Sequence, residues 1–512
     1  MPKWIENAVF YEIYPQSFND TNNDGIGDIN GITEKLDYIK ALGFNAIWMN
    51  PCFKSPFNDA GYDVEDYYTV APRYGTNDDL VNLFNEAHKR DMHILLDLVP
   101  GHTAWTHEWF IKSSMAAKNE YTDRYVWTDT VWNETSGFPT LRGLSERDGS
   151  AVVNFFSHQP ALNYGFYETD PNQPWQQPMN AEGPMSTRNE LKNIIRFWLE
   201  KGCDGFRVDM AFSLVKGDPE EKGTIALWKD IRAYLDKDFP DAAFVSEWGN
   251  ADHSLESGFH MDFLLHFGPS HYNDLFRCEH PFFNADGKGS AKLFVEHYIG
   301  CYEKTAGRGL ICLPTGNHDM YRLPRYLDDR QNRLALAMVL SFPGAPFLYY
   351  GDEIGMRHID LPSKEGGYHR TGARTPMQWD NQKPNCGFSD GNPEDLYLPI
   401  DPDADRPNVA NQLCDDGSLL ALVKKLTSLR KEHSALHNTS DIKFVAYEDF
   451  PLAYIRASEE EKMLVVINPK KDEVSFDFKD SGETVFNIGG DVKFINGKCL
   501  VDGETAAFVK LK

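Results

Sequence analysis

Positively charged residues are scarce in this chain of 512 residues. Lys and Arg together number 51 against 77 Asp and Glu, which leaves a formal net charge of −26 at pH 7. A chain this acidic repels the phosphates of nucleic acids and of anionic membrane surfaces, whereas a neutral polyol such as a sugar feels little of its charge. We therefore expect no nucleic acid among its partners.

Signals for export and for membrane insertion are missing as well. The N-terminus lacks the basic start, apolar stretch and small-residue cleavage site of a secretory signal. The longest apolar run, 334–350, is interrupted by Pro343, Gly344 and Pro346, so it cannot form an unbroken membrane helix of about 20 residues. It predicts a helix, a turn and a buried strand. We expect a cytoplasmic protein without membrane contact, either a monomer or a weak homo-oligomer.

The chain also lacks paired cysteines. The eight cysteines are scattered singly, with no Cys-x-x-Cys pair and no nearby His at a spacing suited to zinc. This pattern predicts reduced thiols instead of disulfides or zinc ligands.

Short β-branched and aromatic runs alternate with longer amphipathic stretches, such as 79–90 and 190–201. This alternation is typical of βα units around a parallel sheet. Eight such units over about 430 residues predict an α/β fold, a (β/α)8 TIM barrel, with a doubly wound open sheet as the alternative. The candidate strands are 9–14, 46–50, 93–99, 205–210, 244–248, 263–267, 310–314 and 346–350.

Two insertions and a second domain complete the predicted organisation. The barrel is assigned residues 1–102 and 187–430. The intervening 103–186 far exceed a βα loop of about two to six residues, so they predict an inserted subdomain after strand 3. Irregular residues 356–410 should cap the same end of the barrel. Short strands from about Asp441, with hairpin signals at Asn496-Gly497 and Asp502-Gly503, predict a C-terminal antiparallel β-domain over 440–512.

The fourth candidate strand carries Arg207 and Asp209, two residues apart. Side chains at this spacing point to one face of a strand. An arginine beside a carboxylate lowers its pKa, which would keep Asp209 ionised and suited to attack an anomeric carbon. A buried structural ion pair is the alternative for these residues alone.

The next candidate strand ends in Glu247, followed by Trp248. An indole beside a carboxylic acid could desolvate it and raise its pKa, as a general acid requires. Retaining glycosidases need two carboxyl groups about 5–5.5 Å apart, and the ends of adjacent barrel strands can supply them. The seventh strand runs into His318 and Asp319, and the third into His102. Four polar clusters at strand ends are hard to explain by stability alone.

These motifs resemble glycoside hydrolase family 13, the α-amylase family, and within it the branch of oligo-1,6-glucosidases and α-glucosidases. They follow in the family's order from Trp4 to beyond Trp379. The resemblance implies Asp209 as nucleophile, Glu247 as general acid/base, and Asp319 as the carboxylate that grips sugar hydroxyls in the transition state. It also implies that Arg207, His102 and His318 hold the sugar and the nucleophile.

The resemblance extends to the closed end of the pocket. Asp59 lies in Asp-Ala-Gly-Tyr-Asp and Arg374 in Gly-Ala-Arg-Thr-Pro-Met-Gln-Trp. In similar α-glucosidases these two positions pair around the terminal glucose, while the position of Tyr62 stacks on the sugar face. This implies exo action, although such a pair could merely fasten two loops.

A calcium loop is predicted near the N-terminus. Oxygen ligands recur at alternate positions around glycines, as calcium requires. The resemblance places the loop away from the catalytic centre, so we expect Ca²⁺, or alternatively Mg²⁺, in a stabilising role. The candidate ligands are Asp20, Asn22, Asp24, Ile26 and Asp28.

The chain departs from the family pattern at three positions. Gly101 stands where amylases usually carry Asn, and Ala161 where Asp is usual. Both missing groups are calcium ligands in typical α-amylases, so an amylase-type calcium and an endo-amylase activity are not expected. Met210 replaces the Val that accompanies α-1,6 preference or the Ala or Thr that accompanies α-1,4 preference, which leaves the linkage open.

Three functions therefore compete. The first is a retaining exo-α-glucosidase that hydrolyses short α-glucosides. The second is a transglucosidase, or a sucrose or trehalose isomerase, that passes the same glucosyl group to another sugar. The third is a non-catalytic carbohydrate-binding relative, which the three intact carboxylates disfavour.

Overall fold

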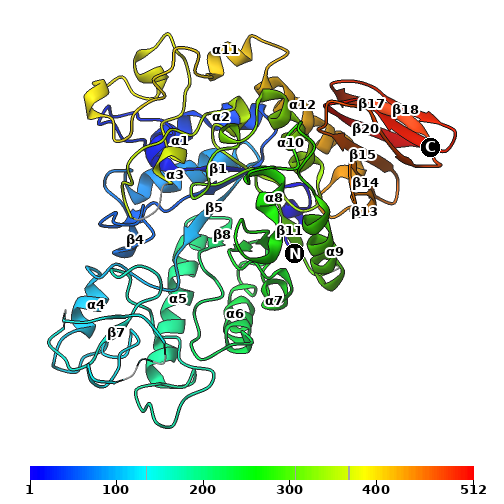
Figure 1. The fold of residues 1–512 in the computed structure, drawn as a ribbon. Coiled ribbons are helices and arrows are strands. Elements are labelled where there is room, and N and C mark those ends of the chain that lie inside the picture. Colours follow the sequence, from blue (N-terminus) through cyan, green and yellow to red (C-terminus); the bar gives the residue numbers. More distant parts are fainter. Residues whose placement is uncertain (134, 136, 144, 306, 367–369) are drawn as a thin grey trace.

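The computed structural model describes residues 1–133, 135, 137–143, 145–305, 307–366 and 370–512. Eight parallel strands form its central sheet (Figure 1). They are β1 Phe10–Ile13, β2 Ala46–Met49, β5 His93–Leu98, β8 Gly205–Val208, β9 Ala243–Ser246, β10 Met261–Phe263, β11 Leu310–Cys312 and β12 Phe347–Tyr349.

The sheet closes into a barrel in chain order. Neighbouring strands pair from β1 through β11, β12 pairs with β1, and a parallel bridge from Pro314 to Phe347 joins the two remaining edges. The predicted (β/α)8 barrel is therefore confirmed, and the open sheet is excluded. Buried apolar side chains fill the barrel interior, where the rings of Phe10 and Phe347 stack with centroids 4.2 Å apart.

Amphipathic helices pack around the barrel, as the 3.6-residue spacing of their apolar positions requires. The longer ones are α3 Asn77–His88, α5 Glu182–Glu200, α6 Lys222–Leu235, α9 Lys292–Thr305, α10 Asp329–Ser341 and α12 Leu419–Glu432; shorter ones are α1 Ile29–Glu34, α2 Leu36–Ala41, α4 Glu108–Ser113, α7 Ala251–Glu256, α8 Tyr272–Phe276 and α11 Val409–Leu413. Within the described ranges, no helix is long and apolar enough to cross a membrane.

Two elements differ from their predicted bounds. The sixth strand ends at Phe263, whereas the apolar run suggested 263–267; Leu264 and Leu265 are buried beyond the end of the strand. Helix α5 begins at Glu182, before the expected start near residue 187, because Pro184 lies in the first helical turn, where a missing N–H is tolerated.

The segment between β5 and α5 projects from the barrel, with α4 and β7 at its outer part (Figure 1). Its regular strands are only β6 Thr140–Leu141 and β7 Ala151–Val152, which pair with each other. A smaller hairpin follows β2, made of β3 Phe53–Lys54 and β4 Asp66–Val70. These excursions and the irregular stretch after β12 leave the barrel at the carboxyl ends of its strands, so they surround the strand ends that carry the polar motifs.

The C-terminal part is antiparallel, as predicted (Figure 1). One sheet contains β13 Asp441–Ala446, β14 Leu452–Ala457, β15 Lys462–Asn468, β17 Gly482–Ile488 and β20 Thr505–Leu511; the other contains β16 Val474–Asp477, β18 Val492–Ile495 and β19 Lys498–Val501. Asn496-Gly497 joins β18 and β19 in a hairpin with positive φ at both residues. The prediction of a second hairpin at Asp502-Gly503 was wrong, because these residues connect strands of different sheets.

Candidate active site

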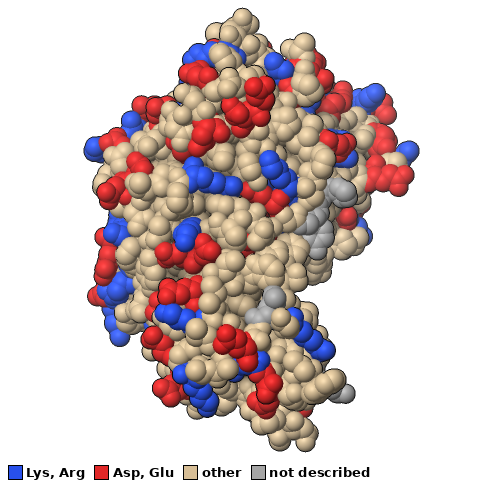
Figure 2. Space-filling model, turned by 90° about the vertical axis from the view of Figure 1, so that its left-hand side faces the viewer, with Lys and Arg blue, Asp and Glu red and all other residues tan. Residues whose placement is uncertain are grey.

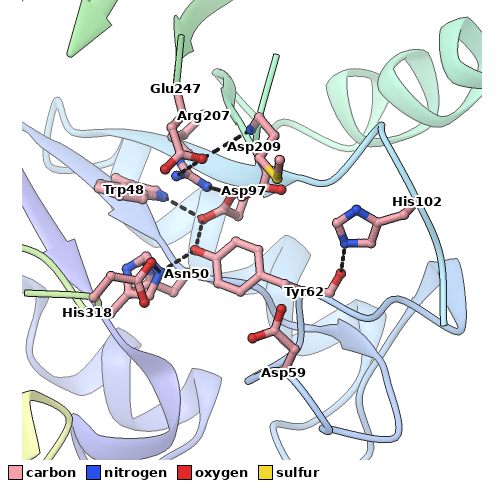
Figure 3. A network of polar contacts seen from close by, with 12 residues as sticks. Trp48, Asn50, Asp59, Tyr62, Asp97, His102, Arg207, Asp209, Glu247 and His318 are labelled. Atoms are coloured by element: carbon pink, nitrogen blue, oxygen red, sulfur yellow. Dashed lines mark hydrogen bonds and ion pairs between the residues drawn. The ribbon is translucent and has the colours of Figure 1, made fainter. Parts of the chain in front are cut away.

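The ends of β8 and β9 bring the two predicted reacting carboxylates to one place (Figure 3). Val208 pairs with Ser246, so Asp209 and Glu247 leave the barrel side by side. The Glu247 amide donates to the Val208 carbonyl at 2.9 Å, and the Met210 amide donates to Glu247 Oε2 at 3.1 Å. Met210 adopts φ +40° to do so, which ties the residue after the nucleophile to the acid.

Arg207 holds three carboxylates with one buried guanidinium. Its Nη1 lies 2.8 Å from Asp97 and 3.1 Å from Asp209, and its Nη2 lies 2.9 Å from Glu247. This is more than the single pair expected from sequence. Three carboxylates around one cation leave the cluster negative, which favours retention of a proton.

The ionisation of Asp209 differs from the expectation. Burial and the charge of Glu247 raise the pKa of the Asp209 carboxyl well above its ordinary value, and the opposing effect of Arg207 is smaller. The sequence-based argument counted the arginine but could not count desolvation or the second carboxylate.

Trp248 does not provide the environment that we predicted for Glu247. Successive strand residues point to opposite faces, and the indole N–H of Trp248 donates to Glu221 at 2.7 Å. The centroid of the Trp248 ring lies 6.2 Å from that of the Phe259 ring. Asp209 and Arg207, instead of the indole, surround the Glu247 carboxyl.

Asp319 is clamped by two arginines. Its Oδ1 lies 2.7 Å from Arg370 and 2.8 Å from Arg374. Burial raises the pKa of this carboxyl, but the charges of His318, Arg370 and Arg374 outweigh it and lower the pKa far below the ordinary value. The two guanidiniums are the charges that persist at neutral pH, because burial lowers the pKa of His318. Asp319 therefore remains ionised at neutral pH.

The partner predicted for Asp59 was wrong. Among the described residues, the guanidinium that reaches its carboxylate belongs to Arg370, at 2.6 Å, while Arg374 donates to Asp319 and to the His318 carbonyl. Gln159 donates to the other Asp59 oxygen at 2.7 Å. Arg370 therefore bridges Asp59 and Asp319, and its position four residues before Arg374 explains the misassignment.

A buried polar network lies beneath the reacting carboxylates (Figure 3). The Tyr62 hydroxyl lies 2.7 Å from His318 Nε2 and donates to Asp97 at 3.0 Å, and the two rings stack with centroids 5.2 Å apart. His318 Nδ1 lies 2.9 Å from Glu12 and 3.1 Å from Asn50. This network fixes the orientation of both rings.

His102 is held from two sides. Its Nε2 lies 3.1 Å from the Tyr62 carbonyl, and Nδ1 lies 3.3 Å from the Asn154 amide. Burial lowers the pKa of His102 to about 3, so the ring is neutral. The Lys216 ammonium donates to Asn154 at 2.9 Å. A side chain at Gly101 would lie 2.6 Å from the Asn154 amide, which accounts for the glycine where amylases have Asn.

These groups open into a cavity of about 700 Å³. Six of the nine predicted catalytic and substrate-binding residues line it, while Arg207, His318 and Arg374 support the wall from behind. Aromatic side chains are added at the rim, where Phe155 is 47% and Phe267 is 51% exposed. The lining consists of Asp59, Tyr62, His102, Phe155, Asp209, Met210, Phe212, Glu247, His266, Phe267, Asp319, Tyr321 and Arg370.

Several functional residues escaped the sequence analysis. Glu12 and Asn50 interrupt or end apolar strands, so a search for polar residues at the ends of the first two strands would have found them. Arg370 and Gln159 lie in irregular segments without a periodic pattern, and no comparable signal marks them.

The predicted calcium loop lies between the short helix Pro15–Ser17 and α1, outside the cavity. Its oxygen types suit a hard cation. Asp20 accepts from the amides of Asn23 and Gly25 at 2.7 and 2.8 Å, and Asp28 caps α1 by accepting from Gly31 at 2.7 Å. No three His, Cys, Asp or Glu side chains of the described chain are gathered to hold a metal ion.

Comparisons with known proteins agree with this geometry. The model of the α-amylase catalytic domain matches residues 12–439. An oligo-1,6-glucosidase of Parageobacillus thermoglucosidasius is 31% identical, with 91% of this chain and 90% of the relative covered. A trehalose synthase/amylase of Mycolicibacterium smegmatis is 32% identical, with 88% and 80% covered.

A solved structure extends the similarity to the whole fold. A mutant isomaltulose synthase of Erwinia rhapontici NX5, in complex with its natural substrate sucrose, is 25% identical with a TM-score of 0.83 and complete coverage of both chains. The matched family region contains Asp209, Glu247 and Asp319, which meet in the cavity. The chain belongs to the α-amylase family, glycoside hydrolase family 13, and is an enzyme that acts on α-glucosides.

Proposed function

We propose that this enzyme is a retaining exo-α-glucosidase that hydrolyses short α-glucosidic oligosaccharides or disaccharides. The observation that carries the proposal is the convergence of Asp209, Glu247 and Asp319 in one cavity, with Arg370 joining Asp59 to Asp319. The first three groups supply the chemistry, and the bridged pair supports recognition of a terminal glucose.

The reaction proceeds in two displacements. Asp209 attacks the anomeric carbon while Glu247 protonates the glycosidic oxygen, so the bond to the leaving sugar breaks and a β-glucosyl ester forms on Asp209. Water then gives a proton to Glu247 and attacks the same carbon, so the ester bond to Asp209 breaks and α-glucose and the free Asp209 carboxylate are released. The productive form carries the proton of the carboxyl pair on Glu247 when the first step begins.

Asp319 and Arg207 stabilise charges that develop during the reaction, and neither exchanges a proton. Positive charge develops on the sugar in the oxocarbenium-like transition state, and the ionised Asp319 faces it. Arg207 touches both reacting carboxylates, so it stabilises the anion that each becomes in turn.

A transglucosidase or isomerase is the second candidate. It is favoured by the similarity to a trehalose synthase/amylase and to an isomaltulose synthase. In this candidate the first displacement is the same, but the second passes glucose from Asp209 to another sugar. The two activities differ in the second displacement: hydrolysis needs water in the cavity, whereas transfer to a sugar requires that water be excluded.

Product analysis decides between them. The purified protein is incubated separately with maltose, isomaltose, maltotriose, sucrose and trehalose, and products are followed by chromatography from the earliest times. Free glucose as the main product supports the glucosidase, and the fastest substrate gives the linkage. A new disaccharide without matching free glucose replaces the proposal by the second candidate, and no product from any sugar overturns both.

We further propose that Asp20, Asn22, Asp24, Ile26 and Asp28 bind a structural Ca²⁺, or alternatively Mg²⁺. The support is the alternation of oxygen ligands around glycines. The ion would stabilise the fold and take no part in either displacement.

A further inference from the structure

Behind the general acid lies a buried carboxyl group that the proposed reaction does not use. Asp262 is on β10, next to the strand that delivers Glu247, and it is fully buried. Its Oδ1 accepts from the Ser246 hydroxyl at 2.7 Å and from the Trp248 amide at 3.1 Å. These two donors are the residues immediately before and after Glu247.

The rest of the contact set also converges on this strand end. The Ser246 hydroxyl lies 2.6 Å from the hydroxyl of Ser254 on α7. Asp262 Oδ2 has no hydrogen-bond partner among the described residues. An ionisable group buried in this way destabilises the fold unless it is compensated, and burial raises the pKa of Asp262 to about 7.

We infer that Asp262 is a positioning residue for the general acid/base: it binds the Ser246 side chain before Glu247 and the Trp248 backbone after it, and so fixes where the Glu247 carboxyl lies. The inner side of that backbone is held separately, because Glu247 N–H donates to Val208. Asp262 supplies the outer restraint. A displacement of about 1 Å at a reacting group can cost roughly a hundredfold in rate, so the restraint matters for proton transfer.

The inference rests on the proposed function and has a signature of its own. A displaced general acid slows only those substrates whose leaving group must be protonated. The fluoride of α-glucosyl fluoride leaves without such help, whereas the sugar of a disaccharide does not. The parameter kcat/KM covers the steps up to glucosylation of Asp209, so it isolates this difference from the later need for a base.

The test compares Asp262→Ala with Asp262→Asn in the full chain. Asparagine keeps an acceptor oxygen for Ser246 and Trp248, and alanine removes it. For Asp262→Ala we expect kcat/KM to fall roughly 10- to 100-fold on the disaccharide that the wild type cleaves fastest and less than about threefold on α-glucosyl fluoride. Asp262→Asn should remain within about threefold of wild type on both.

A matched control separates positioning from general destabilisation. Asp204 is a partly buried carboxylate, with 16% of its side chain exposed, that accepts from the Ile94 amide at 2.8 Å at the opposite end of the barrel strands. Asp204→Ala should lower Tm without a difference between the two substrates. Retained fluoride turnover also shows that Asp262→Ala is folded.

The outcomes are distinguishable. Equal losses on both substrates for Asp262→Ala, or no loss on either, overturn the positioning role while leaving the proposed function intact. A wild-type enzyme inactive on α-glucosyl fluoride and on every disaccharide overturns the proposed function itself.

Discussion

Asp209 is the residue on which the proposed chemistry depends most directly. Replacing it by asparagine removes the nucleophile but keeps the size of the side chain and an oxygen for Arg207. We expect kcat/KM to fall by several factors of ten, each worth about 1.4 kcal/mol of transition-state stabilisation, on both a disaccharide and α-glucosyl fluoride. Steady-state kinetics measures the loss, and circular dichroism checks the fold. Full activity of Asp209→Asn would exclude a glucosyl-enzyme at this residue.

Arg370 neutralises two buried anions. Arg370→Ala leaves Asp59 without its arginine and Asp319 with Arg374 alone. An uncompensated buried charge costs about 3–5 kcal/mol, so KM for a disaccharide should rise strongly and Tm should fall. Arg370→Lys should be intermediate because one ammonium cannot serve both carboxylates as a guanidinium does.

The matched control for Arg370 is Arg333→Ala, which removes an arginine of α10 paired with the exposed Asp329. It should change neither KM nor Tm measurably, since exposed pairs contribute little. If Arg370→Ala behaves like this control, the bridged pair only fastens two segments and the argument for exo action fails.

Asp262 should make stability depend on pH. Burial raises its pKa from the ordinary 3.8 to about 7, so between these values the folded protein keeps a proton that the unfolded chain has lost. The free energy of unfolding should therefore be highest below about pH 4. It should fall by up to about 4 kcal/mol as the pH rises to about 7. The Tm of wild type relative to Asp262→Asn should fall between pH 5 and pH 8. A constant difference between the two proteins contradicts this.

At the residue scale, the sequence was informative where a reactive side chain stands at the end of a predicted strand. Asp209 and Glu247 could be predicted to lie together because each follows the end of a neighbouring strand, whereas Asp319, seven residues beyond β11, was assigned from the family resemblance; all three line one cavity. The partner of Asp59 and the raised pKa of Asp209 were not found, because both depend on distances between segments far apart in the chain. Pairing and desolvation are properties of the assembled cavity.

At the scale of elements, periodicity predicted the strands and their order but not every boundary. The run at 263–267 is apolar because Leu264 and Leu265 are buried beyond β10, and burial alone does not distinguish a strand from a buried loop. Asp502-Gly503 has the composition of a hairpin, yet it joins two sheets. Turn chemistry specifies a local bend, whereas strand pairing is decided by packing elsewhere.

The loop of residues 20–28 gives the prediction that belongs to this scale. If it binds calcium, extensive dialysis against EDTA should lower Tm, and added Ca²⁺ should restore it. At one hundred times its dissociation constant the ion would contribute about 2.7 kcal/mol. Asp24→Ala should abolish the response to calcium, and Asp477→Ala in the C-terminal part should preserve it. An unchanged Tm after chelation excludes a stabilising ion here.

At the scale of the whole molecule, three separate segments build one cavity. The barrel supplies the reacting carboxylates, the segment after β5 supplies Phe155 and Gln159, and the irregular stretch after β12 supplies Arg370. Acidic and basic residues are interspersed on the face drawn in Figure 2, but the cavity is different. Among the described lining residues, four are carboxylic acids, and the one arginine forms ion pairs with two of them.

This charge distribution predicts discrimination against anionic leaving sugars. A phosphate on the leaving sugar would approach a cavity with an excess of carboxylates, and the described lining residues include no lysine and no arginine other than Arg370. Like charges in a low-dielectric cleft oppose binding. We expect kcat/KM for trehalose 6-phosphate and sucrose 6′-phosphate to be at least tenfold below that for the unphosphorylated sugars, a difference of about 1.4 kcal/mol or more. The deficit should shrink in high salt, because screening weakens repulsion. A preference for either phosphorylated sugar at low ionic strength would show that a cation outside the described lining reaches the leaving group.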